Sequence, residues 1–117
     1  MADNNFTSIF SVLHVNDLGA AVDWYARWIG RQPDAAPNED IAEWKLAENA
    51  WIQVSAAPDP SLSGQSFVVC GVRNIEIQRA DCHKAGVIST EIENLGFVRL
   101  CQIKDPAGNT IVFVQEM

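Results

Sequence analysis

The chain lacks the features that would place it in a membrane or in an oxidising compartment. No apolar run approaches the roughly 20 residues that a membrane-spanning helix needs. Residues 1–5 are polar and acidic, without a positive segment ahead of an apolar one, so we expect no signal peptide. The three cysteines, Cys70, Cys82 and Cys101, are scattered, and none has the C-x-x-C spacing. We therefore expect reduced thiols and a cytoplasmic location.

The chain also has few basic residues. Eight lysines and arginines stand against 15 acidic residues, which gives a net charge of −7. Such a surface repels nucleic acids and anionic membranes, and neither is expected as a partner. A cationic ligand is compatible with this charge but is not required by it. With 48% apolar residues, the 117-residue chain has the composition of a globular protein and is long enough for one domain, 1–117, with one core.

The most specific stretch lies near the C-terminus, where D-P-A-G-N occupies positions 105–109. Asp105 can accept hydrogen bonds from its own turn, Pro106 fixes a negative φ, and Gly108-Asn109 tolerate a positive φ. Strand-like runs precede and follow this turn. The sequence therefore predicts a C-terminal hairpin.

Alternating and helical patterns predict the elements of the first half of the chain. A helix from Leu18 to Ile29 follows a cap at Asn16 or Asp17 and ends at Gly30. Its expected buried stripe consists of Leu18, Ala21, Val22, Tyr25, Trp28 and Ile29. Strands are expected over 8–15, 41–46 and 50–56, with an irregular edge over 32–38.

The second half repeats the first at an offset of 57 residues. Phe10 matches Phe67, Val12 matches Val69, and Asp17 matches Asn74. We expect strands over 67–72, 87–92, 97–104 and 110–115, and a helix that starts at the Asn74 cap and ends at Gly86. A period this long, present twice, indicates a duplicated module and not a solenoid. Module one spans about 8–57, a linker 58–65, and module two about 66–116.

The strand–helix–strand–strand–strand order of each module resembles the vicinal oxygen chelate superfamily, which includes glyoxalase I, bleomycin-resistance proteins, fosfomycin-resistance transferases and extradiol dioxygenases. The D-P-x-G-N turn, Val15-x-Asp17-Leu18, Trp24-Tyr25, Ile29-Gly30 and Ala85-Gly86-Val87 carry the resemblance. It implies an α+β fold of two tandem βαβββ modules, whose curled mixed sheet forms a concave trough with helices on the convex face. Short members commonly dimerise and build each cavity at a shared interface, so a homodimer is expected.

The resemblance also indicates where enzymes of the superfamily hold a divalent metal. The matching positions here are Phe10, Phe67 and Val112, and none of these side chains can bind a metal. Moving the alignment by one residue does not produce three ligands either. We therefore expect neither a metal nor another cofactor, and the resemblance does not favour a metal-dependent glyoxalase, dioxygenase or transferase.

Alternation identifies the side chains that would face the trough, with Trp51 and Gln53 as the best-supported pair. The candidate ligand-binding residues are Phe10, Val12, His14, Trp51, Gln53, Phe67, Val69, Leu100, Gln102 and Val112. Ser55 shares their side of its strand. His14 is also a candidate base near neutral pH, and Glu43 is a second acid–base candidate if it points inward in place of Trp44. No cysteine has an activating neighbour, and His83 is expected to face solvent.

Four functions follow from these features. The preferred one is a metal-free protein that binds or sequesters an aromatic or amphipathic small molecule in an apolar trough. The alternative is a metal-independent lyase or isomerase that uses His14 or Glu43 as acid or base. A metalloenzyme with other ligands and a purely structural dimer with a filled trough remain open.

Overall fold

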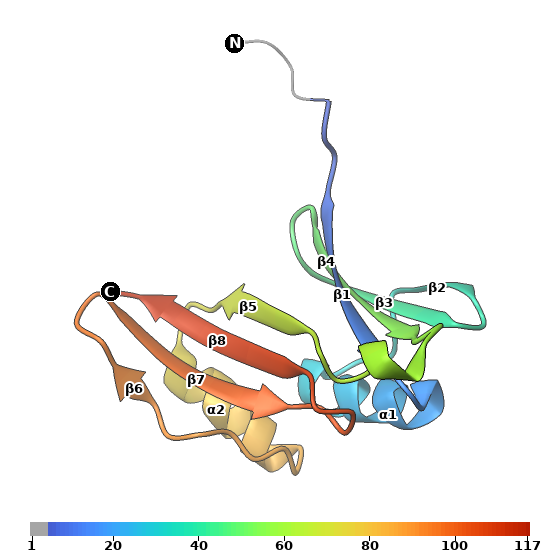
Figure 1. The fold of residues 1–117 in the computed structure, drawn as a ribbon. Coiled ribbons are helices and arrows are strands. Elements are labelled where there is room, and N and C mark those ends of the chain that lie inside the picture. Colours follow the sequence, from blue (N-terminus) through green and yellow to red (C-terminus); the bar gives the residue numbers. More distant parts are fainter. Residues whose placement is uncertain (1–4) are drawn as a thin grey trace.

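The computed structural model of the chain describes residues 5–117 and contains two modules of the same order (Figure 1). Module one consists of β1 (Ile9–Val15), α1 (Leu18–Ile29), β2 (Ala35–Asn38), β3 (Ile41–Ala47) and β4 (Ala50–Ala56). Module two consists of β5 (Phe67–Gly71), α2 (Ile75–Lys84), β6 (Glu93–Asn94), β7 (Val98–Lys104) and β8 (Thr110–Glu116). A short 3₁₀ helix, η1 (Pro60–Leu62), lies in the linker. The predicted α+β fold of two βαβββ modules is confirmed.

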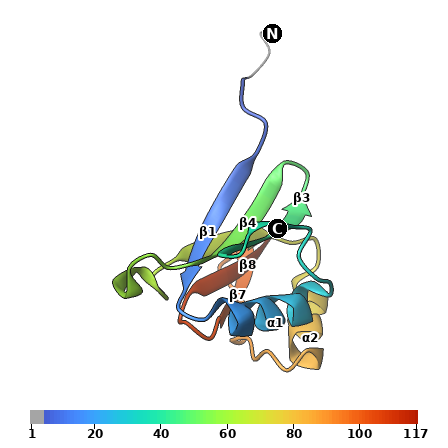
Figure 2. The same ribbon diagram turned by 90° about the vertical axis from the view of Figure 1, so that its right-hand side faces the viewer.

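Each module builds its own four-stranded mixed sheet. Sheet one has the order β1-β4-β3-β2, and sheet two has the order β5-β8-β7-β6. The first strand of each module pairs in parallel with the last, which requires the crossover through the helix. Figures 1 and 2 show both helices on the same side of the two sheets. The sheets do not close, and the radius of gyration of 14.8 Å exceeds the roughly 13 Å expected for a compact chain of this length.

Helix α1 has the caps that the sequence indicates. The Asp17 carboxylate accepts a hydrogen bond from the backbone N–H of Ala20 at 3.1 Å, so Asp17 and not Asn16 is the cap. Gly30 ends the helix with φ of 89°. The predicted buried stripe omitted Trp24, which is buried because its ring packs edge-on against Tyr25 and Trp28. No helix within residues 5–117 is long and apolar enough to span a membrane.

A single core lies between the helices and both sheets. Trp28 of α1 packs edge-on against Phe113 of β8, with ring centroids 5.5 Å apart, so the first helix contacts the second sheet. The Tyr25 hydroxyl donates a hydrogen bond to Asp105 Oδ2 at 2.9 Å. The two modules therefore share one core, and their relative placement depends on these contacts across the repeat.

The predicted C-terminal hairpin is confirmed, and its turn joins the modules. Asp105 Oδ1 accepts hydrogen bonds from three consecutive backbone N–H groups, those of residues 107–109. The Asn109 side chain donates to the carbonyl of His14 and accepts from the N–H of Ser66, both at 2.8 Å. Gly64 donates its N–H to the same His14 carbonyl. Strand β1, the linker and the hairpin therefore meet at one point.

The prediction of a strand over 87–92 is wrong, because only β6 at Glu93–Asn94 pairs with β7 in a regular ladder. Thr90 explains the break. Its N–H donates to the carbonyl of Gln102, but its hydroxyl replaces its carbonyl as the acceptor for the N–H of Gln102. The Thr90 carbonyl is instead bound by Arg79 of α2 and by the Ser89 hydroxyl. The contact from α2 thus occupies the carbonyl that a regular ladder with β7 would use.

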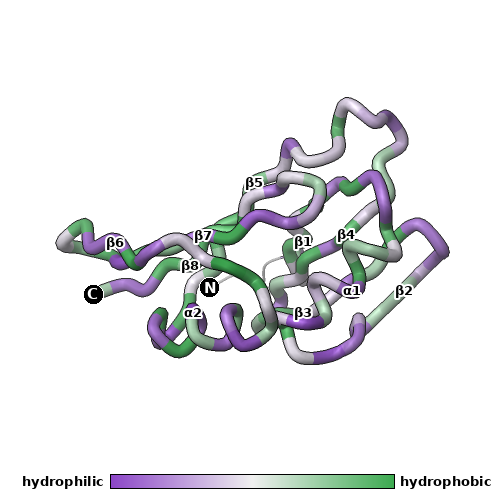
Figure 3. Tube along the Cα trace, turned by 90° about the horizontal axis from the view of Figure 1, so that it is seen from below, coloured by the Kyte–Doolittle hydropathy of each residue, from purple (hydrophilic) through white to green (hydrophobic). Residues whose placement is uncertain are grey.

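The edge of sheet one is irregular, as the sequence predicts. Strand β2 contains Pro37, and its pairing with β3 shifts register between Ala35 and Asn38. The turn that follows β2 is hydrophilic in the hydropathy-coloured view from below (Figure 3), which agrees with its exposed Glu39 and Asp40. Such an edge resists pairing with another sheet.

Candidate functional site

The outward face of sheet one carries three rows of side chains that point away from the helices. Leu13 and Val15 of β1 and Ile52 and Val54 of β4 are buried toward the helices, so alternation turns their neighbours outward. Strand register aligns these neighbours across β1, β4 and β3. The rows are Phe10–Trp51–Lys45, Val12–Gln53–Glu43 and His14–Ser55–Ile41. We call these nine residues the module-one face.

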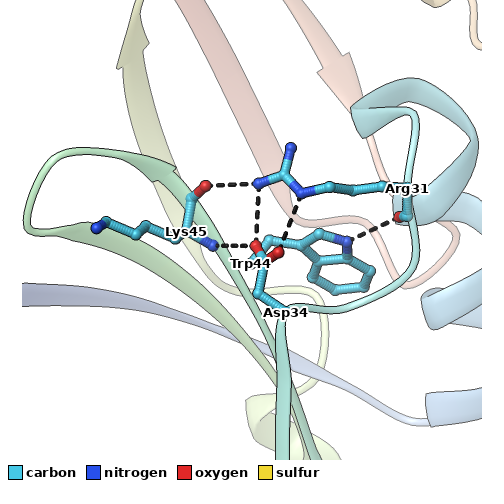
Figure 4. Close-up of polar contacts among 4 residues, drawn as sticks. All are labelled: Arg31, Asp34, Trp44 and Lys45. Carbon is cyan, nitrogen blue, oxygen red and sulfur yellow. Dashed lines mark hydrogen bonds and ion pairs between the residues drawn. The ribbon is translucent and has the colours of Figure 1, made fainter.

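The orientation of β3 follows from the way Trp44 is held (Figure 4). Trp44 is fully buried, and its indole N–H donates to the carbonyl of Arg31 at 3.0 Å. Asp34 accepts from the N–H of Lys45 at 2.8 Å, and Arg31 donates to the carbonyl of Lys45. The hydrogen bond from Arg31 holds the pKa of the Asp34 carboxyl below its usual value. Of the two side chains that could face the trough, Trp44 therefore points into the core and Glu43 points outward.

Phe10 and Trp51 form a stacked aromatic pair on the module-one face. Their ring centroids lie 5.6 Å apart, with an angle of 17° between the planes. Phe10 is 44% exposed, and Trp51 is partly exposed. Stacked rings in contact with solvent are an apolar surface that a planar ligand can cover.

Glu43 and Gln53 form the polar part of the middle row. The Gln53 amide nitrogen donates to Glu43 Oε2 at 2.7 Å. Because an ionised carboxylate can only accept, it fixes which end of the Gln53 amide is the nitrogen. The Gln53 carbonyl oxygen and the second Glu43 oxygen remain as acceptors on the same face. Both side chains are half-buried.

His14 lies where the module-one face meets the linker. Its backbone N–H donates to the Ser66 hydroxyl at 3.4 Å, and its carbonyl accepts from Gly64 and from the Asn109 side chain. Its ring atom Nδ1 is buried and has no hydrogen-bond partner within residues 5–117. The structure thus places this candidate base on the outward face, in a row with Ser55.

The outward face of sheet two is built from the matching positions. Its rows are Phe67–Thr110–Lys104, Val69–Val112–Gln102 and Gly71–Val114–Leu100, and we call these residues the module-two face. Phe67 is 67% exposed and Val69 53% exposed, whereas Val112 is buried. Lys104 Nζ donates to the Thr110 hydroxyl at 2.9 Å. The module-two face is therefore more apolar at its centre and has no carboxylate.

All ten residues predicted to bind ligand lie on these two faces. The module-one face holds Phe10, Val12, His14, Trp51 and Gln53, and the module-two face holds Phe67, Val69, Leu100, Gln102 and Val112. They do not line one enclosed cavity, because the two sheets stay open. A cavity of about 170 Å³ touches Trp51 and Val69, and one of about 320 Å³ touches Gln102. The role of these residues in binding stays a prediction.

The positions that match metal ligands of the superfamily are occupied by Phe10, Phe67 and Val112. Within residues 5–117, no three histidine, cysteine, aspartate or glutamate side chains come together as a group that could hold a metal ion. The residues present at this site therefore do not fit a metal.

The cysteines are free thiols within the fold. Burial raises the pKa of both the Cys70 and the Cys82 thiols to about 11, so neither is a thiolate near neutral pH. Cys82 and Cys101 are fully buried. His83 is exposed, as predicted, and its Nε2 accepts from the N–H of Ser89.

No protein-family model matches the chain, and no curated protein matches it in sequence. Solved structures, however, match it over nearly its whole length. A glyoxalase/bleomycin resistance protein from Catenulispora acidiphila is 26% identical, with a TM-score of 0.87, over 96% of this chain and 100% of that one. These matches give the chain the fold of glyoxalase/bleomycin resistance proteins, which confirms the resemblance to the vicinal oxygen chelate superfamily.

Two further similar structures are ligand-binding proteins. The antibiotic binding protein TnmS3 from Streptomyces sp. CB03234 is 19% identical, with a TM-score of 0.80, over 100% of this chain and 99% of that one. A bleomycin-binding protein from Streptomyces verticillus, solved with copper(II)-bleomycin, is 18% identical, with a TM-score of 0.79, over 98% of this chain and 100% of that one. At these identities the similarity shows the fold alone.

Sequence reasoning missed the Glu43–Gln53 and Lys104–Thr110 hydrogen bonds. Part of the Glu43–Gln53 bond could be foreseen from β3, where the apolar Ala42 and Trp44 alternate with the polar Glu43 and Lys45. That alternation places Glu43 outward, but its pairing with Gln53 depends on the β3–β4 register, which the sequence alone does not specify.

Proposed function

We propose that this chain, whose fold is that of the vicinal oxygen chelate superfamily, is a metal-free protein that binds or sequesters an aromatic or amphipathic small molecule. The ligand lies on the outward sheet faces, and the Phe10–Trp51 pair forms its principal apolar contact. Phe10, Phe67 and Val112 at the metal positions support a site that works without an ion.

The observation that carries this proposal is the solvent contact of Phe10 and Trp51. Large aromatic side chains gain free energy when they leave water, about 25 cal/mol for each Å² of apolar surface buried. The 44% exposed Phe10 and the partly exposed Trp51 have not gained it fully in the single chain. A flat ligand stacked on the pair would complete the burial and add an aromatic contact.

Two of the similar structures support a binding function, whereas others carry glyoxalase names. Those two are called an antibiotic binding protein and a bleomycin-binding protein. The alternative, in which His14 or Glu43 acts as acid or base, has weaker support, because no hydrogen bond from Nδ1 orients the His14 ring and Glu43 already accepts from Gln53. We therefore do not extend the proposal to catalysis.

A homodimer in the cytoplasm is part of the proposal. The sheet faces are open in one chain, and a second copy would supply an opposing wall that encloses the ligand. The exposed Phe67 and Val69 suit such a role. The free cysteines suit a reducing compartment. Sedimentation velocity of the purified protein tests the dimer directly.

Binding of dansylamide, a neutral aromatic fluorophore, tests the proposed function. Its emission should rise and shift to shorter wavelength when it is titrated with the protein, and EDTA should not change the titration. Phe10→Ala should weaken binding, whereas Phe97→Ala should not. Phe97 is a suitable control because it is 71% exposed but lies in the turn before β7, outside both faces. Equal binding by the two variants would contradict the assignment to the module-one face, and a requirement for metal would contradict the metal-free site.

A further inference from the structure

We infer that the module-one face selects a ligand that carries a protonated amine beside its aromatic group, and that Glu43 is the residue that selects it. The inference rests on the proposed function, because it concerns the same face. It adds the charge of the ligand and the side chain that recognises it.

The Glu43–Gln53 pair offers mainly hydrogen-bond acceptors to a ligand. Gln53 donates one of its two amide hydrogens to Glu43, with an N–O distance of 2.7 Å. The atoms left over are mostly acceptors: the second carboxylate oxygen of Glu43 and the carbonyl oxygen of Gln53. One N–H of Gln53 also remains, but acceptors outnumber donors in this row, so a ligand that donates hydrogen bonds is favoured. A protonated amine donates up to three hydrogen bonds, and to a carboxylate each one is strengthened by charge.

Glu43 has no cationic side chain paired with it in the part of the chain that the structure describes. No lysine, arginine or histidine forms an ion pair with it within residues 5–117. Lys45 is the nearest cation along β3 on the same side, but its ammonium lies 3.9 Å from Glu48 in the following turn. Arg31 is committed to Asp34 at 2.9 Å. The carboxylate of Glu43 is thus half-buried beside an aromatic surface, with a hydrogen bond from Gln53 but no ion pair within residues 5–117.

Glu43 lies near the aromatic pair in the strand register. Trp51 lies directly across from Lys45, and Gln53 directly across from Glu43. Glu43 is therefore a diagonal neighbour of Trp51, and diagonal neighbours on adjacent strands lie about 7–8 Å apart. A ring stacked on Phe10 and Trp51 would reach Glu43 with an amine carried on a short flexible arm. The ligand class is an aromatic compound with an aminoalkyl substituent.

The repeat within the chain provides an internal contrast. At the matching row of the module-two face, Val112 stands across from Gln102, so there is neither a carboxylate nor a fixed amide. Phe67 is exposed on the module-two face, as Phe10 is on the module-one face. In the middle row, however, the neutral Gln102 stands on the strand position that Glu43 occupies in module one. Recognition of a cation is therefore a property of the module-one face.

The test uses one fluorophore with three charges. Dansylcadaverine carries a protonated amine on a pentyl arm, its N-acetyl derivative is neutral, and dansyl-6-aminohexanoic acid is an anion. We expect the cation to bind about three- to fivefold more tightly than the neutral compound, as suits a half-exposed ion pair, and the anion to bind most weakly. The preference should shrink as NaCl is raised from about 0.02 M to 0.5 M, because salt screens the pair.

Glu43→Gln should abolish the preference for the cation while binding of the neutral compound is retained. Glu91→Gln is the matched control, since it removes the same charge from an exposed side chain of the segment before β6 and should keep the preference. Equal binding of the three compounds to the wild-type protein would overturn this inference and leave the proposed function standing. Loss of the preference in both variants would also overturn it, because net charge and not Glu43 would then be responsible. Binding of none of the three would overturn both.

Discussion

The module-one and module-two faces share a backbone design but differ in their central strand. The outermost positions of the first row are the same in both, with phenylalanine on the first strand and lysine on the third: Phe10 and Lys45 in one, Phe67 and Lys104 in the other. Between them stands Trp51 on β4 but Thr110 on β8. The two modules therefore share the strand register that aligns these residues, and they differ in the residue on the central strand, which is aromatic in module one and a small polar residue in module two.

The second rows differ in the same way and by more. Val12–Gln53–Glu43 contains a hydrogen-bonded polar pair, whereas Val69–Val112–Gln102 has a buried valine at its centre. One face thus offers an aromatic pair with acceptors, and the other offers apolar side chains at its centre, Val69 and Val112. Two unlike walls are better suited to a ligand with an apolar side and a polar side than two identical walls would be.

The largest expected effect comes from breaking the junction that holds the two faces in place. Gly64 has φ of 77°, and a Cβ there would lie 2.1 Å from the carbonyl oxygen of Ala107. Gly64→Ala should therefore lower the free energy of unfolding by about 3 kcal/mol or more, from backbone strain and a backbone clash together. Urea denaturation measures the change.

Gly96→Ala is the control for this variant. Gly96 has φ of 91°, but a Cβ there meets no atom within 4 Å. Only the strain of a positive φ applies, so the loss should be about 1–2 kcal/mol. Equal losses at the two glycines would show that the contact between linker and hairpin is not what makes Gly64 necessary.

A smaller effect is expected at the buried Tyr25–Asp105 hydrogen bond, which ties α1 of module one to the hairpin of module two. Tyr25→Phe should cost about 1.5–3 kcal/mol, since the bond is made to a buried carboxylate. Burial and the nearby Asp105 raise the pKa of Tyr25 above its ordinary value.

The raised pKa of Tyr25 also predicts a pH dependence. Above about pH 10 the unfolded chain loses the tyrosine proton while the folded chain keeps it, so stability falls as pH rises. Tyr25→Phe should remove this part of the alkaline loss. Buried Cys70 and Cys82, with pKa values raised to about 11, should still cause a loss that begins nearer pH 9 in both proteins. Denaturation curves between pH 7 and about pH 11 compare the two; parallel curves would contradict the role of Tyr25.

These effects indicate how much the sequence could predict. The outward positions followed from alternation and from the repeat, because a buried strand face must be apolar and its neighbours then face the other way. The strand over 87–92 could not be judged this way, since the bond from Arg79 to the Thr90 carbonyl joins distant residues. The open arrangement of the sheets was equally hidden, because contacts such as Trp28 with Phe113 fix it.

The two central positions of the middle rows allow a direct exchange. Val112→Gln should cost about 1–3 kcal/mol, because Val112 is only 8% exposed and a buried amide needs partners. Gln53→Val should cost less than about 1 kcal/mol, since Gln53 is half-exposed and Glu43 can turn to water. Urea denaturation of the two single variants tests the order. A smaller loss for Val112→Gln would mean that Gln102 accepts the new amide as Glu43 accepts Gln53.

The smallest effect separates the two exposed phenylalanines. Phe10 stacks on Trp51 with centroids 5.6 Å apart, whereas Phe67 makes no ring–ring contact within residues 5–117 and stands opposite Thr110. An aromatic pair contributes about 0.5–1.5 kcal/mol beyond its area, so Phe10→Ala should lower stability by about that much more than Phe67→Ala. The comparison is best made at protein concentrations low enough to keep the chain monomeric. Phe67→Ala could instead lower stability more than Phe10→Ala, and do so only at high protein concentration. That result would mean that Phe67 is buried between two copies of the chain and that the module-two face is primarily a dimer interface.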